Sequence, residues 1–354
     1  MKEIGSEFWT NCSPLNGLGV KPLLPKGFNT FYTLCGRTAL EIIVSDILSE
    51  KEESLRVYMP SYCCHTMIEP FISHEVEVQF YDVVLGENGI EKRFDVNNNC
   101  DIVFLLDYFG YVDSKTVNFA KIQKERGKIV IYDSTHSFFC YNLDYSHYDY
   151  VFGSFRKWIG VNAGFCSKQE KWLHTPILSQ NTRYTNARNT SFALKAQFMA
   201  DKEVDKQIFL NQFSKAEESL ETDYKNYAAD EASLQITHSL NVEYLRTRRR
   251  ENAVMLINAF SKKNALVSSM PIEMSEQDCP LFVPLNIDSN KRAQLRNHLA
   301  KNQCYLPCHW PVSNLHCLND TTSFLYEHEL SCICDQRYDT NDIKRLIDVI
   351  TCFI

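Results

Sequence analysis

A lysine that follows a run of β-prone residues is the side chain with the clearest chemical potential. The run Asp149–Phe152 leads into Ser154, and Lys157 comes three residues later. Phe155 and Trp158 give this lysine apolar neighbours, which disfavours the charged ammonium form and favours a neutral amine. A neutral amine can attack a carbonyl carbon and form a Schiff base. The alternative is an ordinary surface lysine in a loop, and the other motifs decide between the two interpretations.

A second polar group follows another apolar run. Asp133 comes directly after Lys128–Tyr132, and His136 lies three residues further on. An acid at the end of a buried strand is either a helix N-cap or a buried counter-charge. Ser134 and Thr135 could cap equally well, so a cap does not require Asp133. This favours the counter-charge interpretation.

A third motif could hold a phosphate group. The segment Leu34–Leu40 places a glycine, the Thr38 hydroxyl and the amides of Thr38 and Ala39 at the start of a strongly helical stretch. The N-terminus of a helix binds phosphate because its amides have no partner inside the helix. Many helices begin with Gly and Thr, so the motif gains weight only from its position before the other two.

Alternating elements must position these motifs. Near-continuous apolar runs predict strands that are buried on both faces, and they alternate with segments of helical period. This order indicates a parallel sheet with helices on its faces. The predicted strands are Arg56–Met59, Val76–Val83, Asp101–Leu106, Lys128–Tyr132 and Asp149–Phe152, and the predicted helices are Thr38–Glu50, His65–His74 and Ser114–Gly127.

The second half of the chain has a different pattern. The stretch Phe192–Tyr227 is charged and helical in period, and the following elements predict a smaller α/β domain. The predicted domains are an N-terminal arm at 1–28, a large domain at 29–245 and a small domain at 246–354. The later elements are helices at Arg248–Phe260, Asn290–Lys301 and Asn341–Ile350, and strands at Leu281–Ile287 and Cys332–Cys334.

Composition excludes several classes of protein. The chain has 354 residues with 44% hydrophobic and 23% charged, which is typical of a globular protein of one large or two ordinary domains. With 37 Lys+Arg against 44 Asp+Glu the net charge is −7, which disfavours nucleic acid and anionic membranes as partners. The basic run Arg246–Arg250 is predicted to be the solvated start of a helix. No apolar run could span a bilayer and no secretory signal is recognised, so a cytoplasmic location is expected.

Fourteen cysteines raise the question of disulfides or metal. Dense disulfide frameworks belong to small secreted domains, so reduced and mostly buried cysteines are expected here. No segment has the repeated C-x2-C pair of a structural zinc site, and no metal is predicted. The soft ligands lie at Cys63–His65, Cys304, Cys308, His309, Cys332 and Cys334.

Taken in order, the three motifs make the chain similar to a known family. A phosphate-binding turn, then Asp133, then Ser154-x-x-Lys157 resembles the fold-type I pyridoxal-phosphate (PLP) enzymes. Within them the chain resembles the sugar aminotransferase branch, the DegT/DnrJ/EryC1/StrS family. The supporting segments are Gly36–Leu40, Pro60–Tyr62, Phe80–Val83, Tyr108–Gly110, Tyr132–His136, Ser154–Trp158, Cys308–Pro311 and Asp335–Tyr338.

The resemblance implies a fold, a cofactor and residue roles. The fold would be the α/β PLP-dependent transferase fold type I, with a mostly parallel central sheet covered by helices and a smaller C-terminal α/β domain. Lys157 would hold PLP as a Schiff base and move the substrate proton, and Asp133 would pair with the protonated pyridine nitrogen. His136 would lie near the phenolic oxygen of the cofactor. Thr38, Ala39 and Ser154 would hold the phosphate through amides and hydroxyls.

The implied reaction is transfer of an amino group from an amino acid to a keto-sugar, nucleotide-linked in this branch, or to a related ketone. Lyase or dehydratase chemistry on the same fold, and a catalytically silent ligand-binding homologue, are the alternatives. Lys157 argues against the dehydratases that carry histidine there. The family often stacks an aromatic residue on the cofactor, and here Tyr62, Cys64 or His65 could take that place. The resemblance also implies a homodimer, with Arg183, Tyr184, Asn186 and Asn189 as candidate contacts to the partner subunit.

Overall fold

The structure is a computed structural model that describes residues 2–49, 54–200, 204–261 and 266–354. The chain forms two compact units, each built from separate segments of the sequence. Unit 1 comprises 1–6, 52–149 and 245–354, and unit 2 comprises 7–51 and 150–244. No helix of the described residues is both long enough and apolar enough to cross a membrane.

Unit 1 contains the parallel strands that the sequence predicts. Their order is β7-β6-β3-β4-β5, in which β7, β6, β3 and β4 run parallel and β5 returns antiparallel to β4. All five residues of β6 are buried, as expected of a strand covered on both faces. The bounds are β3 Arg56–Pro60, β4 Glu77–Gly86, β5 Gly89–Arg93, β6 Ile102–Leu106 and β7 Ile129–Asp133.

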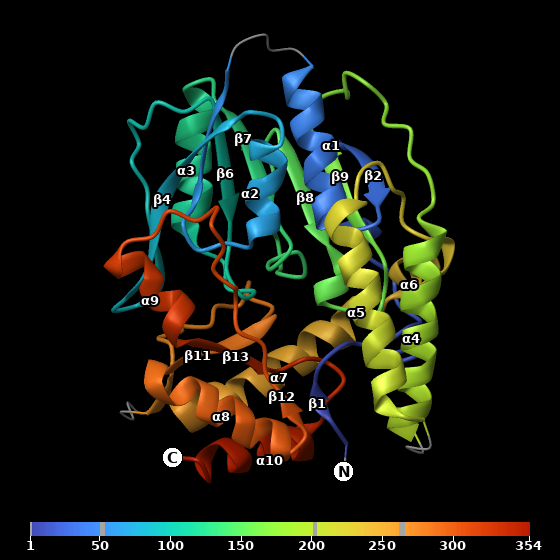
Figure 1. The fold of residues 1–354 in the computed structure, drawn as a ribbon. Helices are drawn as coiled ribbons and strands as arrows, with labels where there is room; N and C mark the ends of the chain where they lie inside the picture. The colour runs from blue at the N-terminus through green and yellow to red at the C-terminus, as the bar shows by residue number, and fades with distance from the viewer. Residues whose placement is uncertain (1, 50–53, 201–203, 262–265) are drawn as a thin grey trace. The chain divides into compact units, whose positions relative to one another are not determined.

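Two helices connect these strands. α3 (Ser114–Glu125) begins where the Asp113 side chain accepts the amide of Lys115, and it packs against β6 and β7 (Figure 1). It ends before Gly127, whose positive φ of 74° suits glycine. α2 (His65–Ile72) packs against β4. The crossover helices therefore lie where the alternation of the sequence predicts them.

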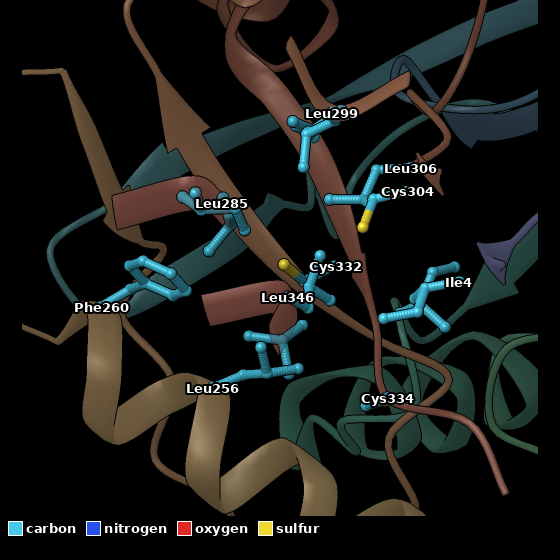
Figure 2. Packing of buried hydrophobic residues seen from close by; sticks show 14 of the residues in the cluster. Ile4, Leu256, Phe260, Leu285, Leu299, Cys304, Leu306, Cys332, Cys334 and Leu346 are labelled. Atoms are coloured by element: carbon cyan, nitrogen blue, oxygen red, sulfur yellow. The ribbon is translucent and has the colours of Figure 1, made fainter. Parts of the chain in front are cut away.

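The C-terminal segment of unit 1 has its own sheet and core. β11 (Phe282–Ile287) pairs antiparallel with β10 (Val267–Ser269) and with β13 (Glu329–Ile333). Buried aliphatic residues and cysteines fill the space between this sheet and its helices (Figure 2). The other elements are β1 Ile4–Gly5, β12 Cys304–Tyr305, α7 Val242–Phe260, α8 Ser289–Lys301, α9 Asp320–His328 and α10 Thr340–Thr351.

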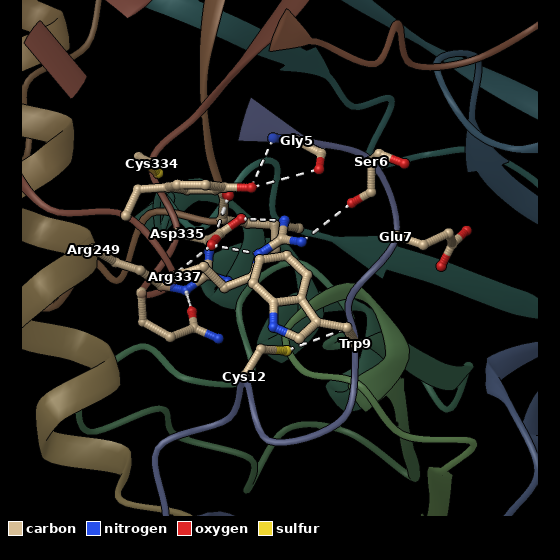
Figure 3. Close-up of polar contacts among 12 residues, drawn as sticks. Gly5, Ser6, Glu7, Trp9, Cys12, Arg249, Cys334, Asp335 and Arg337 are labelled. Atoms are coloured by element: carbon tan, nitrogen blue, oxygen red, sulfur yellow. Dashed lines mark hydrogen bonds and ion pairs between the residues drawn. The ribbon is translucent and has the colours of Figure 1, made fainter. Parts of the chain in front are cut away.

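The N-terminal residues are held inside unit 1. β1 pairs parallel with β12, and the Gly5 amide donates to the Tyr338 hydroxyl at 2.8 Å. Arg337 donates to the Ser6 carbonyl and forms a two-bond ion pair with Asp335 (Figure 3). A segment predicted as part of an extended arm thus contributes a short strand to this core.

The basic run Arg246–Arg250 is not a solvated helix start, contrary to the prediction. Arg249 is 0% exposed and donates to the Gln336 side chain and to the backbone carbonyls of the two residues that precede β11. Arg246 is also buried and donates to the carbonyls of Phe139 and Cys140. The run anchors α7 inside unit 1, because buried carbonyls far away in the sequence supply the acceptors.

Unit 2 has an antiparallel sheet in the order β2-β9-β8. α1 packs against β8 and β9, and α4 packs along α5. The bounds are η1 Lys21–Leu23, β2 Asn29–Thr33, α1 Gly36–Leu48, β8 Tyr150–Ser154, η2 Phe155–Lys157, β9 Gly164–Lys168, α4 Thr182–Ala200, α5 Lys206–Thr222 and α6 Glu231–Ser239.

The long helical stretch predicted at Phe192–Tyr227 is two helices, and the first begins ten residues earlier. α4 starts at Thr182, so Arg183, Tyr184, Asn186 and Asn189 are helical. The predicted helix at 192–227 includes residues 201–203, and the predicted helix after Thr38 includes Glu50; these lie outside the described residues. The polar sequence of 181–189 hides the helix, because its buried positions are Tyr184, Thr185 and Arg188 rather than aliphatic residues.

The α/β fold class is confirmed at the level of elements. The strands β3, β4, β6, β7, β8, β11 and β13 and the helices α1, α2, α3, α7, α8 and α10 overlap the predicted segments. The domain boundaries stay a prediction. All fourteen cysteines are described, none forms a disulfide, and most are buried, as expected.

Candidate functional site

The Ser154–Lys157 segment is a tight turn in unit 2. β8 ends at Ser154, and the 3-10 helix η2 carries Lys157 at its end. The Phe155 amide donates to the Ala163 carbonyl at 2.9 Å, which ties the turn to the start of β9. Phe155 and Trp158 are 1% and 0% exposed and act as anchors on both sides of the lysine.

Lys157 itself is exposed. The apolar side chains of Phe155 and Trp158 point into the core and do not enclose the amine. The prediction that these residues shield the Lys157 amine from water is therefore wrong for the protein without a ligand. The rigid turn instead presents the amine on the surface of unit 2. A ligand that covers this surface would supply the dry surroundings that Schiff-base chemistry needs.

An ion-pair cluster fixes the residue next to Lys157. Both carboxylate oxygens of Glu217 accept from Arg156, at 2.7 and 2.8 Å. Arg188 donates to the same carboxylate at 3.1 Å, and so does the Tyr184 hydroxyl at 3.2 Å. Partial burial alone would raise the pKa of Glu217, but Arg156 and Arg188 outweigh it and lower that pKa to about 2. Glu217 is therefore a permanent anion that holds η2 against α4 and α5.

The same contacts bear on the predicted partner-subunit residues. Tyr184 is fully buried and bonded to Glu217, so it does not reach another subunit. Arg183 and Asn186 are exposed, and Asn189 accepts from Asn162 at 2.9 Å. Tyr184 is therefore removed from the candidate interface.

The start of α1 lies beside the Ser154 turn. Gly164 pairs with Ser154 on one side and with Thr33 on the other. A Cβ at Gly164 would lie only 2.9 Å from the Cys35 carbonyl carbon, so glycine allows the close approach of the turn that opens α1. Unit 2 thus brings Lys157 and Ser154 together with the N-terminus of α1.

Two of the predicted donors at this helix start already have acceptors within the protein. The Ala39 amide donates to the Cys35 carbonyl at 3.1 Å and closes the first helical turn. The Thr38 hydroxyl donates to the Tyr224 carbonyl at 2.5 Å. The Ala39 amide and the Thr38 hydroxyl thus already donate within the protein, and their part in phosphate binding stays a prediction. Cys35 provides no side-chain cap, so the amides of the first turn are the donors that α1 offers to an anion.

Asp133 ends β7 in unit 1 and is 2% exposed. Its Oδ1 accepts the amide of Thr135 at 2.8 Å. The side chain therefore stabilises the turn after β7 and is also a buried carboxyl group. No helix begins here, so Asp133 is not a helix N-cap, and its role as a counter-charge stays a prediction.

His136 lies on this turn, within an aromatic group. Its Nδ1 accepts the Phe109 amide at 3.3 Å, so the proton of the neutral ring is on Nε2. The Trp310 ring stacks on it with centroids 5.5 Å apart and planes at 23°. His309 contacts both His136 and Phe109 edge-on. Asp133 and His136 thus share one buried turn, and their roles at a cofactor stay a prediction.

Tyr62 is part of the core beneath this group rather than a surface available for stacking. It is 0% exposed, and its hydroxyl donates to the His309 carbonyl. Its ring lies edge-on to those of Trp310 and Tyr326. Of the three candidates for stacking on a cofactor, Cys64 and His65 are half-buried and remain.

Phe109 and Trp310 were not assigned roles from the sequence, although both lie in motifs that the resemblance matched. Phe109 has a φ of 57°, and the next residue, Gly110, has a φ of 87°. A Cβ at Gly110 would lie 1.9 Å from the Cys279 carbonyl oxygen, so only glycine fits. In the sequence, the Phe-Gly pair is therefore the feature that could have indicated this loop and its aromatic ring against His136.

The chain is similar to known proteins in its structure. Neither the family models nor the curated proteins give a match. Solved structures do: PseC of Helicobacter pylori, an aminotransferase involved in the biosynthesis of pseudoaminic acid, has a TM-score of 0.65 at 11% identity, with 99% of each chain covered. DesI, solved in the presence of its TDP-sugar product, has a TM-score of 0.63 at 14% identity, covering 99% of this chain and 94% of DesI. NtdA of Bacillus subtilis, solved with bound cofactor PMP, has a TM-score of 0.61 at 11% identity, covering 92% of this chain and 73% of NtdA.

These likenesses establish the fold. The chain has the fold of these aminotransferases, and the fold-type I expectation is confirmed. The donor sets also fit a phosphorylated aldehyde cofactor. Unit 2 offers a lysine amine beside a helix N-terminus, and unit 1 offers a buried carboxyl group beside a histidine.

Proposed function

We propose that this protein is a PLP-dependent aminotransferase of the sugar aminotransferase branch. The observation that carries the proposal is the arrangement in unit 2, where the Ser154–Lys157 turn lies beside the first turn of α1. The turn carries a surface amine, and the helix start could bind an anion, in a fold shared with aminotransferases.

Six residues would hold the cofactor. Lys157 would bind it covalently, and the first-turn amides of α1 at Thr38, with Ser154, would bind the phosphate. Asp133 would keep the ring nitrogen protonated, with His136 beside the ring. Ala39 would lie beside the phosphate in the first turn of α1, although its amide donates to the Cys35 carbonyl. When bound, PLP supplies an electron sink for the charge that develops on the substrate carbon.

The residues of this chain would supply the proton and its control. Lys157 lies at the end of a rigid turn and would move a proton at the substrate carbon as a general base and then acid. Arg156 and Glu217 hold the backbone of that turn from the side, which would keep the base of the Lys157 side chain in place. His136, whose Nδ1 accepts the Phe109 amide, would donate from Nε2 to an oxygen of the bound group.

The proposed substrates are an amino acid donor and a keto-sugar acceptor, in a nucleotide-linked form. The support is that DesI was solved with a TDP-sugar product and that PseC acts in pseudoaminic acid biosynthesis, both on this fold. We also infer a cytoplasmic homodimer, with the exposed residues Arg183 and Asn186 of α4 as candidate contacts. A large domain at 29–245, a small domain at 246–354 and an arm at 1–28 complete this proposal.

The half-reaction provides the test. Purified protein is loaded with PLP, and single amino acids are added while the absorbance spectrum is followed. Conversion to the pyridoxamine form by at least one amino acid, with release of its keto acid, is the expected result. Loss of an α-substituent or CO2 from the added compound would indicate lyase chemistry. A spectrum that no amino donor changes would indicate a silent binding homologue.

A further inference from the structure

Glu329 is a buried carboxyl group for which the proposed reaction has no role. It lies in β13, is 0% exposed, and faces away from solvent in the C-terminal segment of unit 1. Burial raises the pKa of Glu329 to about 8, and the hydrogen bonds from His309 and Ser331 and the charge of Arg292 offset only part of this effect. The group therefore changes charge within the physiological pH range.

The charged and titratable neighbours of Glu329 come from several elements. Arg292 of α8 binds the backbone carbonyls of Tyr326 and Glu329 rather than the carboxylate. Three neutral groups also lie near the Glu329 carboxyl group: the thiols of Cys308 and Cys332 and the hydroxyl of Tyr62. Burial is the largest cause that raises the pKa of each, and the negative charges of Glu329 and other neighbours raise it further. These groups stay neutral below pH 9, so the remaining titratable neighbour is His309.

A hydrogen-bond chain joins Glu329 to the ring of His309. The His309 amide donates to Glu329 Oε2 at 2.6 Å. Ser331 Oγ lies 2.5 Å from Glu329 Oε1 and 2.9 Å from His309 Nδ1. All three residues are buried, so the serine hydroxyl has one proton to share between a carboxyl group and an imidazole.

With His309 as the neutral ring, that single proton permits two arrangements. When Glu329 is ionised, Ser331 must donate to it, so Ser331 can only accept from His309 and Nδ1 carries the ring proton. When Glu329 is protonated, it donates to Ser331, which then donates to His309 Nδ1, and the ring proton is on Nε2. Loss of one proton from Glu329 therefore moves the ring proton of His309 from Nε2 to Nδ1.

We propose that Glu329, acting through Ser331, is a proton-controlled positioning residue that sets which nitrogen of His309 carries the proton. His309 contacts Phe109, His136 and Trp310, so the switch changes a donor at Nε2 into an acceptor beside the His136 turn. The tautomer switch stands independently of any reaction. Its effect on turnover rests on the proposed function, in which His136 lies next to the cofactor.

The protein contains a matched internal control. Ser313 Oγ lies 3.0 Å from His316 Nδ1, which resembles the Ser331–His309 pair. The Ser313 amide also donates to His316 Nδ1 at 3.1 Å, and His316 Nε2 lies 3.1 Å from the Cys63 carbonyl. Nδ1 must accept and Nε2 must donate, so His316 has one tautomer whatever the state of its serine.

The test is a pH titration of the histidine ring nitrogens by ¹⁵N NMR, on full-length protein labelled at histidine. Protonated and unprotonated ring nitrogens have well separated shifts, and the His309→Gln variant identifies the His309 signals. We expect the two His309 nitrogens to exchange shifts with a midpoint near pH 8, while His316 keeps its protonated Nε2. A His309 ring with one tautomer from pH 6 to pH 10 would overturn the proposal, whatever the behaviour of any variant.

Two variants test the path. In Glu329→Gln the amide group can donate to Ser331 and accept from the His309 amide at every pH, so His309 should keep its proton on Nε2. In Ser331→Ala the link between the two residues is removed, and the step near pH 8 should vanish from the His309 signals. If either folded variant retained the full exchange near pH 8, Glu329 would not be its cause.

Catalysis adds a readout that separates this proposal from the proposed function. In wild-type protein the pH profile of kcat/KM should bend near pH 8, and Glu329→Gln should remove the bend. If the His309 nitrogens exchange shifts but the pH profile of kcat/KM is the same in wild type and Glu329→Gln, the positioning role in catalysis is overturned. The tautomer switch itself would still stand. An NMR exchange in a protein without transamination would overturn the proposed function alone.

Discussion

Two glutamates next to the proposed cofactor-binding segments have opposite titration behaviour. Glu217 in unit 2 lies between Arg156 and Arg188, and its pKa is lowered to about 2. Glu329 in unit 1 has hydrogen bonds to neutral groups, and burial raises its pKa to about 8. The pairing with arginine makes Glu217 a permanent charge that suits a rigid support. The lack of such pairing makes Glu329 responsive to pH, which suits a switch.

A third carboxyl group, that of Asp133, extends this comparison, and its substitution should have the largest effect of those proposed. Asp133 is buried like Glu329, but its partner in the proposed function is the ring nitrogen of the cofactor. Asp133→Asn should retain cofactor and lose at least about 10²-fold in the rate of the half-reaction, equivalent to about 2.7 kcal/mol. The measurement is the single-turnover rate at saturating cofactor.

The Asn side chain keeps the shape and can still accept the Thr135 amide, so the turn after β7 should survive. Thermal unfolding of Asp133→Asn serves as the control for folding. A folded variant with an unchanged half-reaction rate would remove Asp133 from the mechanism.

The second effect concerns the stability of unit 1 at alkaline pH. The folded pKa of Glu329 lies above the ordinary value of 4.5, so the folded state binds the extra proton between these two values. The contribution of Glu329 to stability is complete below about pH 4.5 and is lost as the pH rises through about 8. Over that range the free energy of unfolding falls by at most about 1.4 kcal/mol per pH unit. Urea unfolding from pH 5 to pH 9 measures it.

Glu329→Gln is the matched variant, because it stays neutral and keeps the shape of the side chain. Its free energy of unfolding should fall less than that of wild type over this range. Parallel curves for the two proteins would mean that Glu329 does not titrate between pH 5 and pH 9.

The smallest effect is expected at Glu217, whose side chain is 40% exposed. Glu217→Gln removes the charge that Arg156 and Arg188 share, and solvent screening limits the loss of stability to about 1–2 kcal/mol at pH 7. Because the folded pKa is lowered, this contribution is present above about pH 4.5 and is lost as the pH falls through about 2.

Glu218→Gln is the control for this substitution, since Glu218 is the next residue of α5 and is exposed, with one bond to Ser214. It should change the free energy of unfolding by less than about 0.5 kcal/mol. Equal effects of the two substitutions would show that the arginine pairing adds nothing.

The contrast between the two glutamates could not be predicted from the sequence, whereas the elements around them could. Apolar runs identify β6 and β7 because a strand buried on both faces needs no other signal. The Gly-Arg-Thr-Ala start of α1 and the turn at Ser154 are also local patterns. The fold class and the position of the candidate site follow from such local patterns.

Contacts between distant residues decide the rest. The Thr38 hydroxyl finds its acceptor at Tyr224, 186 residues away, and Arg249 finds Gln336 87 residues away. Arg156 and Glu217 are separated by 61 residues. No local pattern marks a polar side chain as buried when its partner lies so far along the chain. For this reason the basic run was predicted to be solvated and the Tyr224 acceptor of Thr38 was not foreseen.

The most direct test of the account is the identity of the residue that holds the cofactor. PLP-loaded protein is reduced with borohydride, digested, and analysed by mass spectrometry for the peptide that carries the pyridoxyl group. We expect the label on Lys157 and no labelled peptide from Lys157→Ala. Lys92 is buried and paired with Asp107, so Lys92→Met should leave the label unchanged. A label on another lysine in wild-type protein, or a stable adduct in Lys157→Ala, would contradict it.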